Sequence, residues 1–133
     1  MTHKYDLDQK MELCLQFETE FPDSSVLGDV YTLLMDAHNQ RNESDQTIEY
    51  GEMALERDGE NVTALMTVAR TLSVARQQPA KAVDYAERAV NTIEEMKTGD
   101  MPQQFTPETW QAYLTSLEGP ARDILSYARA VSP

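Results

Sequence analysis

Apolar and polar residues follow a helical period along nearly the whole chain. Apolar or small residues recur three and four positions apart, so each segment turns one stripe toward a neighbour. Turn and cap residues separate the segments, as in Asp58-Gly59-Glu60-Asn61 and Thr106-Pro107. The pattern predicts an all-α protein without strands and with seven helices, at residues 7–21, 25–40, 45–57, 62–76, 80–97, 107–118 and 121–131.

The chain repeats itself with a period near 34 residues. Residues 48–55 match residues 83–90 at a shift of 35, with tyrosine, glutamate and alanine recurring identically. Upstream, Tyr31, Leu34, Met35 and His38 fall on Leu65, Val68, Ala69 and Leu72 at a shift of 34. One extra residue in the turn at 74–79 reconciles the two shifts. Self-similarity at such a period is typical of helical-repeat proteins.

Residues 26–96 resemble two consecutive tetratricopeptide repeats, in the form of a bacterial-type helical-repeat domain. The family pattern is carried on the first helix by Leu65, Val68, Ala69 and Leu72, and on the second by Ala82, Ala86 and Ala89. The earlier unit has Thr47, Gly51, Ala54 and Gly59, while Met35 and His38 depart from the pattern. The resemblance implies an α-α superhelix, a solenoid of antiparallel helix pairs in which small residues allow close helix approach.

The expected organisation is a single domain over residues 1–133. It comprises an unpaired helix (7–21), repeat one (25–57), repeat two (62–97), a linker (98–106) and a degenerate third pair (107–131). Gly119-Pro120 is expected to divide this third pair. The expected buried stripes of the terminal helices are Met11, Cys14, Leu15 and Phe17 at one end, and Trp110, Tyr113, Leu114, Leu117, Ile124, Tyr127, Ala130 and Val131 at the other.

Charge narrows the classes of partner. The 133 residues include 23 acidic against 11 basic residues, a net charge of −12. Phosphate contacts need clustered Lys and Arg, so the sequence disfavours nucleic acid and anionic membrane surfaces as partners. No apolar run approaches the roughly 20 residues of a membrane helix, and residues 1–10 are too polar for a signal peptide. Direct membrane insertion is not expected, and no compartment is assigned.

Residues that carry catalytic chemistry are scarce. Cys14 has no partner for a disulfide or a metal site, and its apolar neighbours predict a buried thiol. His3 and His38 are far apart, and His38 lies on a core-facing stripe, where a satisfied interior histidine is expected. Glycine-rich phosphate loops, nucleophile elbows and zinc-spaced clusters do not occur in the sequence. We therefore expect no enzyme, no cofactor and no metal.

The family resemblance implies a concave groove lined by the first helix of each pair. The partner-binding positions that it implies are Asp29, Thr32, Asp36, Asn39, Thr63, Met66, Arg70, Ser73 and Gln111. Asp36 and Arg70 occupy equivalent positions and are expected to approach each other. The positions at which chaperone-binding members clamp a carboxylate are Thr32, Asp36, Thr67, Glu108 and Ala112 here, and none carries a positive charge. A carboxylate clamp of that type is not expected.

The sequence and the family resemblance predict two alternative functions. The first is a non-catalytic scaffold that binds a peptide or a partner protein in the groove. The alternative is a structural fragment of a longer helical-repeat protein, whose contacts are mainly with neighbouring repeats or with a copy of itself. Uncovered apolar flanks on the terminal helices predict a weak homodimer that strengthens with salt, because salt screens the repulsion between acidic chains.

Overall fold

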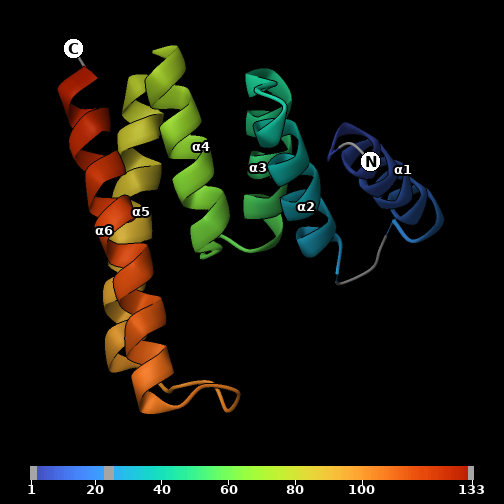
Figure 1. Ribbon diagram of the computed structural model, residues 1–133. Coiled ribbons are helices and arrows are strands. Elements are labelled where there is room, and N and C mark those ends of the chain that lie inside the picture. The colour runs from blue at the N-terminus through green and yellow to red at the C-terminus, as the bar shows by residue number, and fades with distance from the viewer. Residues whose placement is uncertain (1–2, 23–25, 132–133) are drawn as a thin grey trace.

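Six helices make up the described chain, which comprises residues 3–22 and 26–131, with side chains described from residue 8 onward. In this computed structural model the helices are α1 (His3–Glu20), α2 (Leu27–Gln40), α3 (Ser44–Arg57), α4 (Val62–Ala75), α5 (Pro79–Thr98) and α6 (Pro107–Val131) (Figure 1). No strand occurs in these residues, so the all-α prediction is confirmed. Residue 25, the expected start of the second helix, lies outside the described residues.

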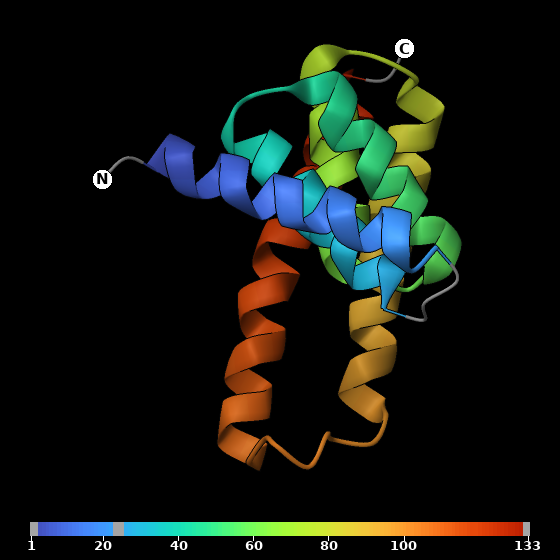
Figure 2. The same ribbon diagram turned by 90° about the vertical axis from the view of Figure 1, so that its right-hand side faces the viewer.

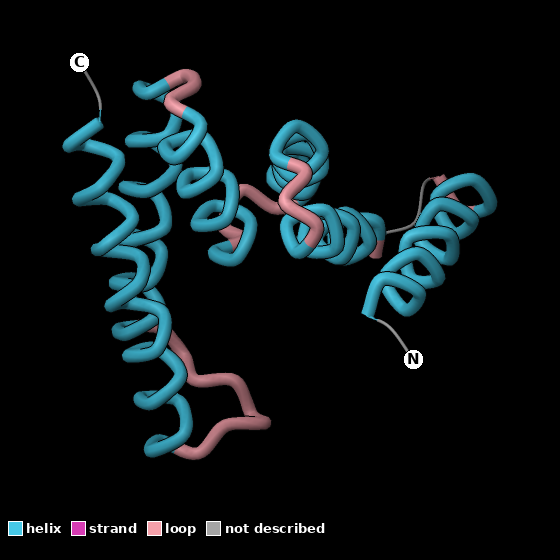
Figure 3. The backbone as a smooth tube through the Cα atoms, turned by 45° about the horizontal axis from the view of Figure 1, so that its top comes forward, coloured by secondary structure: helices cyan, strands magenta, loops and turns pink. Residues whose placement is uncertain are grey.

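The helices pack in chain order. Successive helices contact each other throughout, as α1 with α2, α2 with α3, α3 with α4, α4 with α5, and α5 with α6. The alternate helices α2, α4 and α6 also touch, α2 with α4 and α4 with α6. The helices therefore follow one another across the molecule, with the N- and C-terminal ends on opposite sides (Figures 1 and 3). Every helix between α1 and α6 has packed neighbours on two sides.

The prediction of two helices at 107–118 and 121–131 is wrong, because α6 runs through Pro120 without a break. Proline removes one backbone donor and crowds the preceding turn, which normally ends a helix. Here Ser116, Gly119 and Pro120 are all exposed, so water can reach the carbonyl oxygen that lacks its helical donor. Gly119 also has no Cβ to meet the proline ring. The buried positions Leu114, Ala121 and Ala128 continue across the proline.

The predicted helix starts at 62 and 107 are confirmed by their caps. Asn61 Oδ1 accepts a hydrogen bond of 3.1 Å from the backbone N–H of Ala64, and Thr106 Oγ1 accepts one of 3.2 Å from Thr109. Such side-chain acceptors satisfy amide donors that have no partner within the helix. Pro107 follows Thr106 at the first helical position, as expected.

The core lies between the two matched helix pairs, and the repeat positions fill it. Tyr31, Leu34, Met35 and His38 are buried on α2, and their matches Leu65, Val68, Ala69 and Leu72 are buried on α4. The small residues Ala54, Ala86 and Ala89 have no solvent-exposed surface. Small side chains at these positions let the helices approach closely, as predicted from the sequence.

The terminal stripes are buried only in part. Cys14 is buried and Met11 partly so, as expected, but Leu15 is 43% exposed, because α1 packs on α2 alone. On α6 the residues that reach the core are Ile124, Leu125 and Ala128, whereas Tyr127 is 41% exposed. The other terminal positions have the following burial: Leu114 is buried, Trp110, Leu117 and Val131 are half-buried, and Tyr113 and Ala130 are exposed. The expected positions Leu114, Leu117 and Ile124 therefore do face other helices, whereas Ala128 is buried in place of Tyr127 and Ala130, because the stripe continues from Leu114 through a single helix.

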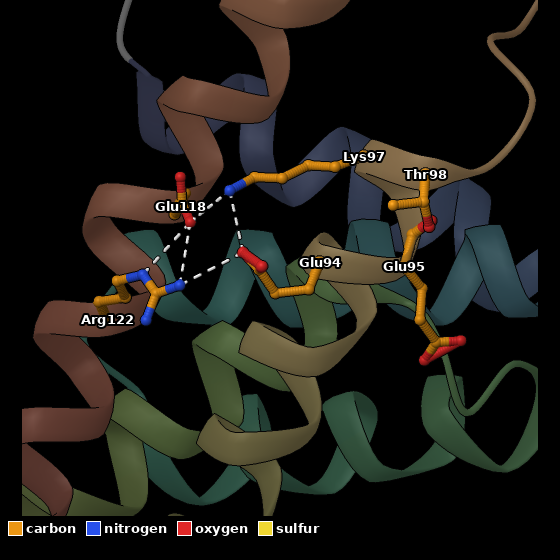
Figure 4. A network of polar contacts seen from close by, with 6 residues as sticks. All are labelled: Glu94, Glu95, Lys97, Thr98, Glu118 and Arg122. Atoms are coloured by element: carbon orange, nitrogen blue, oxygen red, sulfur yellow. Dashed lines mark hydrogen bonds and ion pairs between the residues drawn. The ribbon is translucent and has the colours of Figure 1, made fainter.

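The hairpin of α5 and α6 extends beyond the other helices (Figure 2). Four charged side chains join its two arms (Figure 4). Lys97 Nζ lies 2.6 Å from Glu118 Oε2 and 2.9 Å from Glu94 Oε1, while Arg122 Nη2 lies 3.0 Å and 3.2 Å from the same two oxygens. The hydrogen bond from Lys97, followed by that from Arg122, lowers the pKa of Glu118 to about 2. This network fixes the two helices relative to each other.

Candidate functional site

Two hydrogen bonds bring together α2 and α4, the first helices of the matched units. Asn61 Nδ2, just before α4, donates to Thr32 Oγ1 of α2 at 3.0 Å. The amide oxygen of Asn61 therefore caps α4, while its amide nitrogen contacts α2. Arg70 Nη2 of α4 donates to Asn39 Oδ1 of α2 at 3.2 Å. Three predicted site residues, Thr32, Asn39 and Arg70, therefore take part in contacts between these helices.

Asp36 and Arg70 do not form the expected contact among the described residues. Asp36 Oδ2 accepts a hydrogen bond of 2.8 Å from Gln40 Nε2 on its own helix, and Arg70 reaches Asn39 instead. Arg70 does approach α2, as the repeat pairing required, but its contact lies about one turn further along the helix than Asp36. Within the described chain Arg70 forms no ion pair, so this exposed cation is not neutralised by any of the described acidic residues.

Ser73 does not line a groove. Its side chain is 1% exposed, and its Oγ donates to the carbonyl oxygen of Ala69 at 2.8 Å. A serine that satisfies its hydroxyl within its own helix can occupy a buried position, which the sequence pattern could not distinguish from an exposed one. Asp29 and Thr63 are exposed, and Met66 is half-buried and packs against the core.

A small polar pocket of about 120 Å³ lies where α2, α3 and α4 meet. Its lining residues are Asn39, Asn42, Ser44, Thr47, Arg70, Thr71 and Val74. Asn39 and Arg70 were predicted as site residues, and Val74 is an exposed apolar side chain beside them. Asn42 and Ser44 were missed, because Asn42 lies in the turn after α2 and Ser44 is the first residue of α3. Asn42 has a φ of 59°, a left-handed conformation that asparagine tolerates better than most residues, and this is the signal that marks the turn.

Gln111 lies in a different hollow from the other predicted residues. An open depression of about 760 Å³ runs along the first half of α6 and is lined by Pro107, Glu108, Gln111, Ala112, Thr115 and Ser116. These residues recur three and four apart, so they share one face of the helix. None of the α2 or α4 positions lines this depression. The structure therefore divides the predicted site into a part between α2 and α4 and a part on α6.

A further polar cluster lies between α3 and α5 and was not predicted as a site. Tyr85 donates from its hydroxyl to Glu52 Oε2 at 2.9 Å, and Lys81 forms an ion pair with the same carboxylate. Arg88 lies 5.5 Å from the centre of the Tyr85 ring. Burial, followed by the hydrogen bond to Glu52, raises the pKa of Tyr85 to about 12. Glu56 and Leu55 complete the lining of a hollow of about 330 Å³.

Two of the residues considered for chemistry, His38 and Cys14, are held inside the fold, whereas the side chain of His3 lies outside the described ones. His38 is buried, its Nδ1 lies 2.8 Å from Glu43 Oε1, and its ring stacks on Tyr50 with centroids 5.4 Å apart. The prediction of a satisfied interior histidine is confirmed. Cys14 is also buried, and this burial raises the pKa of its thiol. A thiol with a raised pKa is a poor nucleophile near neutral pH, because the thiolate is the reactive form.

Among the described side chains, those of residues 8–22 and 26–131, no three His, Cys, Asp or Glu residues are grouped so as to hold a metal ion. None of the described helices combines the length and apolar character that a membrane crossing requires. No protein-family model, curated protein or solved structure matches this chain.

Proposed function

We propose that this chain is a non-catalytic scaffold that binds a peptide or a partner protein on the surface shared by α2 and α4. In this proposal the helices form a solenoid of the tetratricopeptide type, with α2/α3 and α4/α5 as its helix pairs. The burial of equivalent positions in both units and the packing of helices in chain order support that assignment. First helices that lie side by side in such a solenoid create an extended surface for a partner.

The observation that carries the proposal is the contact of Arg70 with Asn39. The guanidinium of Arg70 is exposed and forms no ion pair among the described residues. It lies beside the amide of Asn39 and next to the exposed apolar side chain of Val74. The segment 62–75 contains no acidic residue, although the chain as a whole carries a net charge of −12. A partner can therefore approach α4 without desolvating carboxylates there. Arg70 favours a partner segment with an acidic residue beside an apolar one.

Photocrosslinking tests this placement. A photoreactive amino acid is introduced at the exposed position Thr63 of α4 and, as a matched control, at the exposed position Glu56 of α3. We expect crosslinks to a partner protein from position 63 and not from position 56. Arg70→Ala should reduce that crosslink at least tenfold. Arg129→Ala removes the same charge from an ion pair between α6 and Glu87 of α5, and should preserve the crosslink. Equal crosslinking from both positions, unaffected by Arg70→Ala, would contradict a binding surface on α2 and α4.

A second candidate function is a structural role in a larger helical assembly. The observation that favours it is the exposed apolar surface at the terminal helices, where Leu13 of α1, Phe21 just after it and Tyr127 of α6 are 63%, 51% and 41% exposed. Exposed apolar side chains of this size mark contact surfaces when they are grouped. Polar substitutions at these residues should abolish association and leave the Thr63 crosslink unchanged. This outcome separates a structural role from partner binding.

A further inference from the structure

The polar pocket where α2, α3 and α4 meet carries an excess of hydrogen-bond donors. Four of its lining residues have side-chain N–H or O–H groups that are not used up inside the fold: Asn39 of α2, Asn42 of the following turn, Ser44 of α3 and Arg70 of α4. Within the described part of the chain, no aspartate or glutamate lines the pocket. Donors without a carboxylate among them favour an anion as the ligand.

The contact between Arg70 and Asn39 orients the donors. Arg70 Nη2 donates to Asn39 Oδ1 at 3.2 Å, and a guanidinium carries more N–H groups than this single bond uses. Because the amide oxygen of Asn39 faces Arg70, its NH₂ group remains available as a donor. Among the described side chains, the amide of Asn42 and the hydroxyl of Ser44 take part in no hydrogen bond, and both residues are exposed.

Two further lining residues close the pocket on the side of the core. Thr47 and Thr71 are buried, and their hydroxyls donate to the carbonyl oxygens four residues earlier, at 2.8 Å and 2.7 Å. Their hydroxyl protons are therefore committed to the backbone. Binding is left to the donors of α2, the turn, α3 and α4, which surround the pocket from different elements.

The hollow between α3 and α5 shows what is special about Arg70. That hollow also holds two cations, but Lys81 forms an ion pair with Glu52, and Arg88 Nη1 lies 3.8 Å from Asp84 Oδ2. There the chain itself supplies the negative partners. Arg70 forms no ion pair within the described chain and shares its pocket with donors only. The anion that fits this pocket therefore belongs to another molecule.

We propose that the polar pocket binds a phosphate monoester, carried by the partner segment as a phosphoserine or phosphothreonine. This inference deepens the proposed function and rests on it for the source of the phosphate. Sites for whole small molecules measure about 300–1,000 Å³, so a pocket of about 120 Å³ accommodates a single functional group of a larger partner. A phosphate group presents three acceptor oxygens and a charge of about −1.5 to −2 at neutral pH. A carboxylate presents two oxygens in one plane, which match one arginine fork but not donors on several sides.

The surroundings of the pocket fit a segment that lies along α4. Val74 is 64% exposed at the pocket, so an apolar residue next to the phosphorylated one finds a contact. Thr63 precedes Arg70 by about two helical turns and therefore lies on the same side of α4. The net charge of −12 opposes any anion, so we expect free phosphate to bind more weakly than the same group on a segment that also contacts Val74.

A nuclear magnetic resonance titration of the isotope-labelled full chain tests the pocket in phosphate-free buffer at pH 7. The probes are acetyl-phosphoserine-leucine amide, the same dipeptide with serine or glutamate in place of phosphoserine, and inorganic phosphate. The phosphoserine dipeptide should shift the amide signals of Asn39, Asn42 and Ser44, and should bind at least tenfold more tightly than the glutamate dipeptide. Inorganic phosphate should shift the same signals with weaker binding, and the serine dipeptide should shift none of them.

Surface variants with matched controls assign the binding to the pocket. Arg70→Gln should weaken binding of the phosphoserine dipeptide at least tenfold, because it removes the charged donor. Arg76→Gln is the control, since Arg76 is an exposed arginine at the end of the same helix, forms no ion pair in the described chain and does not line the pocket. Ser44→Ala should weaken binding about fivefold, as expected for one neutral hydrogen bond, and Ser126→Ala should not. Circular dichroism checks that each variant keeps its fold.

Several results would overturn the phosphate pocket. Equal losses in Arg70→Gln and Arg76→Gln would reduce the effect to general charge attraction, and equal binding of the glutamate dipeptide would assign the pocket to a carboxylate. Equal binding of inorganic phosphate would contradict a phosphate carried on a segment. A phosphoserine dipeptide that shifts no signal, while the Thr63 crosslink persists, would remove this inference and leave the partner surface. Binding that depends on Ser44 and Arg70, without any Thr63 crosslink, would support the pocket and contradict the partner surface alone.

Discussion

Gly51 of α3 lies directly against the side chain of Val68 of α4. A Cβ built on Gly51 would overlap Val68 Cγ2 and would lie 3.1 Å from Met35 Sδ on α2. The close approach of three helices at this point therefore depends on a position without a side chain. The two residues belong to different units of the repeat, which makes this contact a direct measure of how tightly the units pack.

We predict that Gly51→Ala destabilises the protein, by about 1–3 kcal/mol, because the added methyl group overpacks the contact. Val68 is β-branched and cannot easily turn away. In an exposed helix the same change would instead stabilise by roughly 0.5–1 kcal/mol. Chemical denaturation measures the free energy of unfolding, with the exposed change Ser126→Ala as control. A stabilised Gly51→Ala variant would show that α3 and α4 are further apart than described.

A second packing prediction concerns Ala89, which has no exposed surface on α5. Ala89→Leu should lower the free energy of unfolding by roughly 1–3 kcal/mol, because the added volume has no space to enter. Ala130 is an exposed alanine on α6, and Ala130→Leu should change it by less than about 0.5 kcal/mol. Comparison of the two melting curves checks this, and equal curves would place Ala89 at the surface.

The sequence predicts the helices well where periodicity and caps agree. Asn61 and Thr106 were read as caps, and both accept the expected backbone hydrogen bonds. Periodicity fails to predict details that depend on neighbouring helices. Leu15 is apolar but exposed, because only α2 packs on α1 among the described helices. Ser73 is polar but buried, because its hydroxyl donates a hydrogen bond to a carbonyl oxygen of its own helix.

The candidate site was predicted only in part for a similar reason. The pairing of units correctly placed Arg70 next to α2. Which residue it contacts depends on the length and direction of the side chains: Arg70 donates a hydrogen bond to Asn39, while Asp36 accepts one from Gln40. Local sequence rules cannot rank such alternatives, because the partners differ by a single helical turn. The turn residues of the polar pocket depend on backbone geometry that forms only when α2 and α3 pack together.

Pro120 supplies a test of the continuous α6 helix. Proline in a helix interior is about 3 kcal/mol less favourable than alanine, so Pro120→Ala should raise the free energy of unfolding by up to about that amount. Pro107 stands at the first helical position, where the missing N–H costs nothing, so Pro107→Ala should have little effect. If α6 were two helices that meet at Gly119, Pro120→Ala would give no such gain.

The ion network of the α5–α6 hairpin predicts a pH dependence with a definite sign. The pKa of Glu118 is lowered from 4.5 to about 2 in the folded protein, so its ionised form is favoured by folding. A lowered folded-state pKa contributes stability above pH 4.5, and this contribution is lost as the pH falls toward 2.

Glu118→Gln removes the charge but keeps the shape of the side chain. Wild type should therefore melt at a higher temperature than Glu118→Gln at pH 6, and the difference should shrink progressively on acidification. High salt at pH 6 should also reduce the difference, because all four side chains of the network have solvent-exposed surface. Asp123 is an exposed acidic residue on the same helix and forms none of the hydrogen bonds or ion pairs described, so Asp123→Asn serves as the control for loss of one negative charge. A constant difference between wild type and Glu118→Gln from pH 6 to pH 3, or an equal effect of Asp123→Asn, would contradict the role of the network.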